Sequence, residues 1–472
     1  MKNKYLFILL LLLPFQFVWG QTGGFIGTWE GKLNVGIELR IVFHIKQQAD
    51  GSLQSTADSP DQSAYGLKCD TTIVSGNELT IQMLDLGASY TGKMTDDSTM
   101  EGIFTQRAEF PLTLKKVEQV SERKRPQTPQ PPFPYRSEDV VYNNSDSSLR
   151  YGATITIPEG KGPFPAAVLI TGSGAQDRDE TLFGHKPFAV IADHLTKNWY
   201  IVLRVDDRGT GKSTGDFSKS TTEDFAKDVS NSVDYLLTRP EVDKKKIGLI
   251  GHSEGGMIAP MVATSRKDID FIVLLAAPGV RITELMAEQN AAILRSSGLS
   301  IEAVSEAKKL FKLLVSTIRG TSDSATALQQ VSMAMENWKA KQADSILIAL
   351  ELSKPEKRKE YISVMTNQLQ GPWFRYFMNF DPKPYLEQLN CKVLALNGSR
   401  DIQVISSQNL PGIEAALKRS KAKAVTLKEL PGLNHLFQSC NACTIDEYGL
   451  LEETFSPAAL LDMSNWLNKN VK

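Results

Sequence analysis

The segment Lys246-Ile-Gly-Leu-Ile-Gly-His-Ser-Glu-Gly-Gly256 decides which fold this sequence predicts. Its apolar run, residues 247–250, leads into a Gly-x-Ser-x-Gly pattern, and the small apolar residues 257–263 that follow suit a packed helix. A strand, a sharp turn flanked by glycines and a helix form the context in which a serine acts as a nucleophile. We therefore predict that Ser253 is a nucleophile at the edge of a sheet. The alternative is an ordinary turn in which Ser253 caps the next helix.

The composition is that of an ordinary globular protein, with 472 residues, 41% of them hydrophobic and 23% charged, and a net charge of −1. This length accommodates one large domain and a smaller one. The near-neutral charge gives no electrostatic basis for binding nucleic acid or an anionic membrane. We therefore expect no nucleic-acid partner, and the composition leaves the oligomeric state open.

The first twenty residues have the pattern of a secretory signal peptide. Lys2 and Lys4 precede an apolar run over residues 5–19, and Val18-Trp19-Gly20 places fairly small residues at the expected cleavage positions. The run is shorter than the roughly 20 apolar residues that span a bilayer, and it contains Pro14. We expect residues 1–20 to be removed, no stable membrane span to remain, and the mature chain to act in the periplasm or outside the cell.

Two regions precede the predicted catalytic domain. Residues 21–116 predict a small β domain, because short alternating segments are separated by turn signals such as Asp50-Gly51. Its role stays open between binding a polymer and covering an edge of the catalytic domain. Residues 117–135 are charged and proline-rich, which predicts a semi-rigid linker.

Residues 136–472 alternate apolar strands with helices, which predicts an α/β fold with a doubly wound, mostly parallel sheet. The alternation stops at about residues 280–380, where the pattern is helical and no strand is evident. Such an insertion, at the sheet edge that carries the nucleophile, predicts a lid; a helical layer that only packs is the alternative. Trp373, Phe374 and Phe377 at its end are candidates for an apolar substrate pocket, with core packing as the other interpretation.

A serine nucleophile needs a general base, usually a histidine held by a carboxylate. Of the five histidines, His435 lies in the loop after the last expected strand, where loops that follow parallel strands gather. Asp401 follows the preceding strand and is the expected acid; it could instead be a turn aspartate, and Asp381 and Glu429 are weaker candidates. The chain order Ser253, Asp401, His435 is the order that this fold uses.

The oxyanion hole is expected to combine two backbone N–H groups, those of Glu254 and Ser173. Ser173 lies in a glycine-rich loop after a buried strand, and the charged residues 177–180 of that loop are expected to be structural. The segment 206–213 lacks the spacing of a phosphate-binding loop, so we interpret it as a structural turn.

The four cysteines give no complete metal site. Cys440-Asn-Ala-Cys443 is a lone C-x-x-C pair, and zinc would require more ligands in a suitable spacing. In an oxidising compartment the pair could form a local disulfide, and two unpaired thiols are the alternative. We expect neither a metal nor another cofactor.

Several motifs together resemble the α/β-hydrolase superfamily. They are Gly172-Ser-Gly-Ala-Gln-Asp-Arg-Asp179, Asp207-Arg-Gly-Thr-Gly-Lys-Ser213, Gly251-His-Ser-Glu-Gly-Gly256 and the loops of Asp401 and His435. Within the superfamily they are similar to secreted bacterial carboxylesterases with Gly-Ser-Gly-x-x-Asp-Arg-Asp. The resemblance covers residues from about 138 to the C-terminus and not the β domain. Thr171-Gly172 replaces the His-Gly of many lipases' oxyanion loops.

The resemblance implies a Ser–Asp–His hydrolase that acts on carboxylic esters without a cofactor. We expect a small-molecule ester with a short to medium acyl chain as the substrate. A serine peptidase or a thioesterase could use the same three residues, and a non-catalytic binding protein on a hydrolase scaffold is the remaining alternative.

Overall fold

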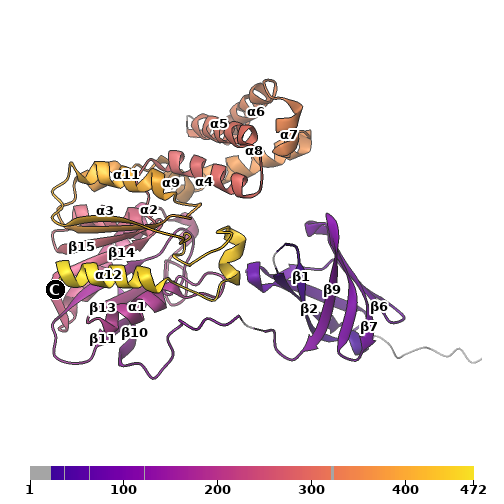
Figure 1. The fold of residues 1–472 in the computed structure, drawn as a ribbon, viewed down its shortest axis with the longest axis horizontal. Helices are drawn as coiled ribbons and strands as arrows, with labels where there is room; N and C mark the ends of the chain where they lie inside the picture. The colour runs from indigo at the N-terminus through magenta and orange to yellow at the C-terminus, as the bar shows by residue number, and fades with distance from the viewer. Residues whose placement is uncertain (1–22, 37, 63, 122, 320–323) are drawn as a thin grey trace, which may run out of the picture. The chain divides into compact units, whose positions relative to one another are not determined.

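The computed structural model describes residues 23–36, 38–62, 64–121, 123–319 and 324–472. The expected signal peptide, residues 1–20, lies outside these ranges. Within them, no helix combines the length and the apolar character that crossing a membrane requires. The chain divides into two compact units, Met1–Glu122 and Arg123–Lys472 (Figure 1).

The first unit is an all-β half-barrel built from one antiparallel sheet, with strand order β4-β3-β2-β1-β9-β8-β7-β6-β5. Alternating side chains of these strands are buried, and Trp29, Phe43 and Tyr90 are fully enclosed between them. The strands are β1 (Gly27–Asn34), β2 (Glu38–Gln47), β3 (Leu53–Ser59), β4 (Ala64–Lys68), β5 (Thr71–Ser75), β6 (Glu78–Met83), β7 (Ala88–Asp96), β8 (Thr99–Gln106) and β9 (Ala108–Val117). Short 3-10 turns are η1 (Gly23–Phe25), η2 (Pro60–Gln62) and η3 (Leu84–Leu86).

The second unit contains an eight-stranded sheet with the order β10-β11-β13-β12-β14-β15-β16-β17. The pairs β10–β11 and β11–β13 are antiparallel, and the remaining pairs are parallel. All seven residues of β12 are buried, as expected for a strand covered on both faces. The strands are β10 (Tyr135–Asn143), β11 (Arg150–Pro158), β12 (Phe164–Ile170), β13 (Ile201–Val205), β14 (Val242–His252), β15 (Ile269–Leu275), β16 (Lys392–Gly398) and β17 (Val425–Leu430).

Helices cover both faces of this sheet. On one face, α1 (Pro187–Lys197) contacts α12 (Pro457–Asn470); on the other lie α2 (Thr222–Thr238), α3 (Gly255–Ser265) and α11 (Ser406–Leu417) (Figure 1). Two short turns, η4 (Phe217–Lys219) and η5 (Ile445–Leu450), precede α2 and α12. The C-terminal ends of β12, β14, β16 and β17 therefore supply the loops in which the predicted site residues lie.

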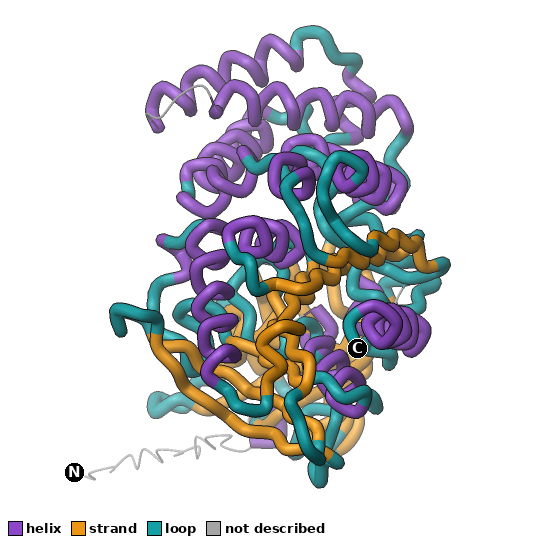
Figure 2. Tube along the Cα trace, turned by 90° about the vertical axis from the view of Figure 1, so that its left-hand side faces the viewer, coloured by secondary structure: helices purple, strands orange, loops and turns teal. Residues whose placement is uncertain are grey.

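A helical insertion separates β15 from β16 and appears as a cluster of helices without strands (Figure 2). On its helix α6, Ala327, Val331 and Met335 recur every four residues and are buried, which explains the helical pattern read from the sequence. The helices are α4 (Ile282–Ser296), α5 (Ile301–Arg319), α6 (Ser324–Lys339), α7 (Asp344–Ala349), α8 (Pro355–Gln370) and α9 (Pro372–Asn379), and α10 (Lys383–Glu387) leads into β16.

The proline-rich segment is fastened to the second unit by two side chains. Arg125 donates to the carbonyl oxygens of Gly449 and Leu451, both at 2.7 Å. Gln127 donates to the carbonyl oxygen of Phe455, also at 2.7 Å. The residues after 122 thus belong to the second unit.

Candidate active site

Ser253 occupies a tight turn between β14, which ends at His252, and α3, which begins at Gly255. Its backbone has a φ of +52°, a left-handed conformation that non-glycine residues rarely adopt, and its N–H donates to the carbonyl oxygen of Leu275 at 2.9 Å. A Cβ atom on Gly251 would lie 2.1 Å from the carbonyl oxygen of Gly255. The turn therefore requires glycine beside the serine, and Ser253 is left half-buried at the sheet edge.

His435 and Asp401 meet in the loops after β17 and β16. The Nδ1 atom of His435 lies 2.8 Å from Oδ2 of Asp401, and both residues are buried. The other oxygen of Asp401 accepts the backbone N–H groups of Gln403 and Val404 at 2.8 Å. These bonds hold the carboxylate in place. They leave Nε2, the second ring nitrogen of His435, as the nitrogen that can exchange a proton with another group.

The two weaker candidates for the acid lie elsewhere. Asp381 pairs with Arg281 at 3.0 Å, and Glu429 accepts a hydrogen bond from the Ser406 hydroxyl at 2.5 Å. Among the described residues, neither is bonded to His435. Asp401 is therefore the carboxylate that orients the imidazole.

The other histidines have structural partners. His44 is bonded to Asp58 in the first unit. His194 is bonded to the Ser464 hydroxyl, and His185 to Thr454. Burial, with the nearby charge of Arg125, lowers the pKa of His185 to about 4, so this ring is neutral near pH 7.

A cleft of about 480 Å³ opens beside Ser253. Its walls combine the turn with the glycine-rich loop, the loop after β16 and helices α4 and α9 of the insertion. The lining residues are Ser173, Ser253, Glu254, Pro278, Leu285, Met286, Gln289, Trp373, Phe374, Phe377, Gln403 and Val404. The cleft thus brings together the predicted nucleophile, both predicted oxyanion residues and all three predicted pocket aromatics.

The predicted nucleophile, Ser253, and the predicted base, His435, come from neighbouring loops. The ring of His252, which directly precedes Ser253, lies 4.8 Å from the ring of His435 between centroids. In the described part of the chain, no hydrogen bond joins the Ser253 hydroxyl to His435. Such catalytic hydrogen bonds often tighten only when substrate binds.

The side chain of Glu254 is a buried acid that sequence reasoning missed. Its carboxyl group accepts the Thr222 hydroxyl at 2.6 Å and the indole N–H of Trp373 at 2.9 Å. Burial raises its pKa to about 7, although both hydrogen bonds oppose this rise. Glu254 is the one acidic residue in the mostly small and apolar segment 251–263, and this was the signal available in the sequence.

A second carboxyl group with a raised pKa lies behind the glycine-rich loop. Asp207 accepts the Thr171 hydroxyl and the Gln176 N–H, each at 2.9 Å. Burial raises its pKa to about 8, and the charges of Glu180 and Glu254 act in the same direction. The neighbouring Asp206 instead pairs with Arg178 at 2.6 Å, as suits a structural turn.

His252 and Glu180 form a buried contact beneath the turn. The Nδ1 atom of His252 lies 2.9 Å from Oε1 of Glu180, and this same oxygen accepts the Gly172 N–H at 2.6 Å. The Nε2 atom of His252 lies 3.0 Å from the backbone carbonyl oxygen of His435. No local sequence pattern indicates this link, because Glu180 and His252 are 72 positions apart.

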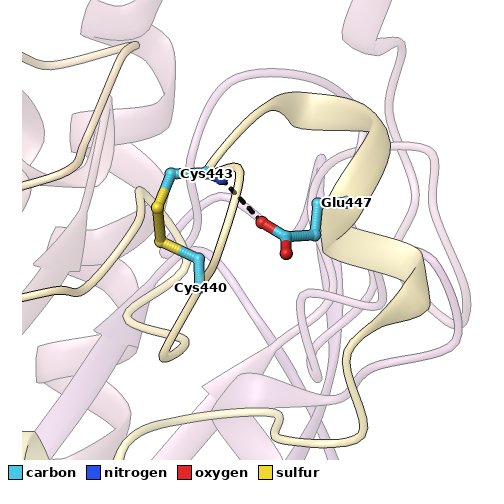
Figure 3. A group of neighbouring side chains, drawn as sticks. All are labelled: Cys440, Cys443 and Glu447. Atoms are coloured by element: carbon cyan, nitrogen blue, oxygen red, sulfur yellow. Dashed lines mark hydrogen bonds between the residues drawn. A yellow bond between two sulfur atoms is a disulfide. The ribbon is translucent and has the colours of Figure 1, made fainter. Parts of the chain in front are cut away.

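A disulfide joins Cys440 and Cys443 in the loop after His435 (Figure 3). The carboxylate of Glu447 accepts the Cys443 N–H at 2.6 Å and the Asn441 N–H at 3.0 Å. Because the two sulfur atoms are bonded to each other, this cluster fastens the loop and does not offer thiolate ligands. Cys69 and Cys391 are free and buried.

Comparison with known proteins places this arrangement in a family. Residues 147–421 match the model of the X-Pro dipeptidyl-peptidase (S15) family. The chain is 33% identical to esterase EstD of Thermotoga maritima over 158 residues, which are 34% of this chain and 36% of that protein. It is 29% identical to mouse acyl-coenzyme A thioesterase 3 over 136 residues, 27% of this chain and 26% of that protein. The chain thus spans only about a third of the length of these curated relatives.

A solved structure of the Pyrococcus furiosus esterase Pf2001 aligns with 72% of this chain and 92% of its own, at 14% identity and a TM-score of 0.43. The family match spans more than half of the chain, from β11 to the segment before β17. With its Gly-x-Ser-x-Gly turn and its predominantly parallel sheet, this chain is an α/β hydrolase and belongs to the X-Pro dipeptidyl-peptidase (S15) family.

Proposed function

We propose that this protein is a serine esterase that cleaves carboxylic esters through Ser253, His435 and Asp401. One observation carries the proposal. The buried bond between His435 and Asp401 fixes an imidazole at the sheet edge where Ser253 sits in a left-handed turn. A serine, a histidine and a carboxylate in this chain order support nucleophilic acyl transfer.

In the proposed reaction, His435 takes the hydroxyl proton of Ser253 while the serine oxygen attacks the ester carbonyl carbon. The backbone N–H groups of Glu254 and Ser173 are the proposed donors to the resulting oxyanion. His435 then gives its proton to the departing alcohol, and an acyl-enzyme forms. Water that loses a proton to His435 attacks this acyl group, and Ser253 recovers its proton as the acid leaves.

We interpret the sheet with its two covered faces as doubly wound, and the insertion as a lid over the cleft. Trp373, Phe374 and Phe377 support this interpretation, because all three line the cleft beside Ser253. The one charged side chain among the lining residues, Glu254, is engaged by Thr222 and Trp373. An uncharged ester with an apolar acyl or alcohol group and a short to medium acyl chain fits such walls.

A peptidase is the second candidate, and the family description favours it, since S15 members are described as X-Pro dipeptidyl-peptidases. A thioester is also a candidate substrate, because the mouse relative is named a thioesterase. A panel of nitrophenyl esters graded by acyl length, a thioester and an aminoacyl-prolyl anilide separates these candidates. We expect the highest kcat/KM on an ester of two to about eight carbons. Faster cleavage of the anilide than of the esters would show that the protein is a peptidase rather than an esterase.

Because residues 1–20 have the pattern of a signal peptide, we also propose that the enzyme works outside the cytoplasm. Expression in a bacterial host, followed by N-terminal sequencing of the exported protein, is expected to give Gln21 as the first residue. Retention of the intact N-terminus in the cytoplasmic fraction would contradict export.

A further inference from the structure

We infer that Glu180 and His252 form a buried ion pair that positions the glycine-rich loop, the nucleophile turn and the histidine loop relative to one another. This inference rests on the proposed esterase function and deepens it, since Glu180 and His252 then act through Ser253 and His435 as positioning residues.

The contacts of His252 define the charge of its ring. Nε2 faces the backbone carbonyl oxygen of His435 at 3.0 Å, and a carbonyl oxygen can only accept a hydrogen bond. Nδ1 faces an oxygen of Glu180 at 2.9 Å, and that oxygen already accepts the Gly172 N–H. Both ring nitrogens therefore meet acceptors, so the ring carries two protons and pairs with a carboxylate.

The pair connects three segments whose relative positions matter for the proposed reaction. Glu180 holds Gly172, whose neighbour Ser173 is a proposed oxyanion donor. His252 is followed directly by Ser253. Its Nε2–H bonds to the main chain of His435, the proposed base. A displacement of one of these groups by about 1 Å can cost roughly 100-fold in rate.

The ion pair of Glu180 and His252 lies in buried, apolar surroundings. Glu180 is 1% exposed and His252 is 5% exposed. Apolar side chains close the space around them, namely Pro187, Phe188, Ile191, Leu275, Leu436 and Phe455. A charge removed from water in this way is costly unless it is paired, so neither partner is dispensable.

The ionisable groups around His252 favour its cationic form. Burial opposes protonation, but the charge and hydrogen bond of Glu180, the hydrogen bond to the His435 carbonyl and the charge of Asp401 together outweigh it, so the pKa of His252 is raised. The ring of His435 faces His252 from the last loop. Asp207, behind the glycine-rich loop, is a further ionisable group whose charge interacts with that of Glu180.

Glu180→Gln tests the pair, because it keeps the side-chain volume and an acceptor for Gly172 but removes the charge. We expect kcat on nitrophenyl butyrate to fall 10- to 100-fold with KM changed by less than threefold. Without the carboxylate, His252 loses its proton at lower pH, so the alkaline limb of the kcat profile moves to lower pH. Glu241→Gln, at a surface ion pair with Arg136, is the matched control and leaves both quantities unchanged.

An unchanged alkaline limb in a folded Glu180→Gln enzyme would overturn the inference, since a merely structural glutamate would not move it. His252→Gln is expected to lower kcat similarly, whereas His194→Gln, at a bonded histidine outside the cleft, is its control.

Histidine NMR tests the charge without any activity measurement. With ¹⁵N-histidine labelling, the spectrum of the wild-type protein at pH 7.5 is expected to show both ring nitrogens of His252 protonated, with the assignment given by His252→Gln. A neutral His252 ring would overturn the inference even if the enzyme hydrolyses esters. If instead no ester is cleaved while the ring is cationic, the proposed function fails and the ion pair stands.

Discussion

The indole N–H of Trp373 donates to both carboxylate oxygens of Glu254, at 2.9 and 3.1 Å. Trp373 belongs to helix α9 of the insertion, and Glu254 directly follows Ser253. The insertion is therefore fastened to the residue that supplies a proposed oxyanion donor. This bond joins the insertion to the turn that carries Ser253.

Trp373→Phe removes this bond while it keeps an aromatic ring in the cleft. A hydrogen bond to a charged partner contributes about 1.5–3 kcal/mol, so we expect roughly a 10- to 100-fold fall in kcat/KM on apolar nitrophenyl esters. Trp338→Phe, at a buried tryptophan of α6 that does not line the cleft, is the control and changes kcat/KM little. Equal losses in the two variants would show that the effect comes from packing of the insertion alone.

Asp401→Asn tests the orientation of the base. The asparagine keeps an acceptor for the backbone N–H groups of Gln403 and Val404, but it turns an amide N–H₂ toward His435 and disfavours the required tautomer. We expect kcat to fall roughly 10³- to 10⁴-fold with little change in the far-ultraviolet circular dichroism spectrum.

Two matched variants accompany this test. Asp381→Asn and Glu429→Gln alter the weaker candidates for the acid, which are bonded to Arg281 and Ser406. Both are expected to keep kcat within about threefold of the wild type. A fall in kcat in either variant comparable to that of Asp401→Asn would show that the residue changed there is the acid.

The raised pKa of Glu254 makes stability depend on pH. Its folded-state pKa of about 7 exceeds the ordinary 4.5, so the folded protein holds a proton that the unfolded chain has released between these values. The free energy of unfolding should therefore fall as the pH rises from 4.5 to 7, by up to about 3 kcal/mol from this group.

Glu254→Gln removes this dependence, because the amide does not ionise. Urea unfolding curves followed by tryptophan fluorescence at pH 5 and pH 8 compare the two proteins. We expect the variant to gain stability relative to the wild type at pH 8 but not at pH 5. The opposite sign would mean that Glu254 is held as a carboxylate in the folded protein.

Gly255→Ala tests the geometry of the turn. A Cβ atom there would lie 2.2 Å from the carbonyl oxygen of Ile170, a backbone atom that cannot move aside without displacing β12. We expect a loss of about 3 kcal/mol or more in the free energy of unfolding, together with loss of activity. Gly371→Ala, whose new Cβ would lie 3.5 Å from its nearest neighbour, should melt within about 2 °C of the wild type. Similar melting temperatures for both variants would contradict the packing described for the turn.

The sequence could predict those parts of the site that follow from chain order along a parallel sheet. Ser253 and Asp401 follow the buried ends of β14 and β16, His435 follows the edge strand β17, and parallel strands end at one edge. The helical insertion was likewise visible, since its apolar residues keep helical spacing and no strand pattern interrupts them.

Other features depend on contacts between distant residues and left no local pattern. The bond between Trp373 and Glu254 spans 119 positions, and that between His252 and Glu180 spans 72. The edge strand β10 includes exposed polar residues such as Arg136, Ser137 and Asp139, so its apolar content is low. The sequence therefore predicts where the reacting groups gather better than it predicts what holds them there.

Labelling with a fluorophosphonate tests most directly whether Ser253 is an activated nucleophile. We predict one adduct per chain, mapped by mass spectrometry to Ser253, with loss of nitrophenyl butyrate hydrolysis in proportion to labelling, and no adduct in Ser253→Ala. A folded wild-type protein that stays unlabelled, or one that is labelled at another serine and keeps its activity, would contradict the proposal that Ser253 carries out ester hydrolysis.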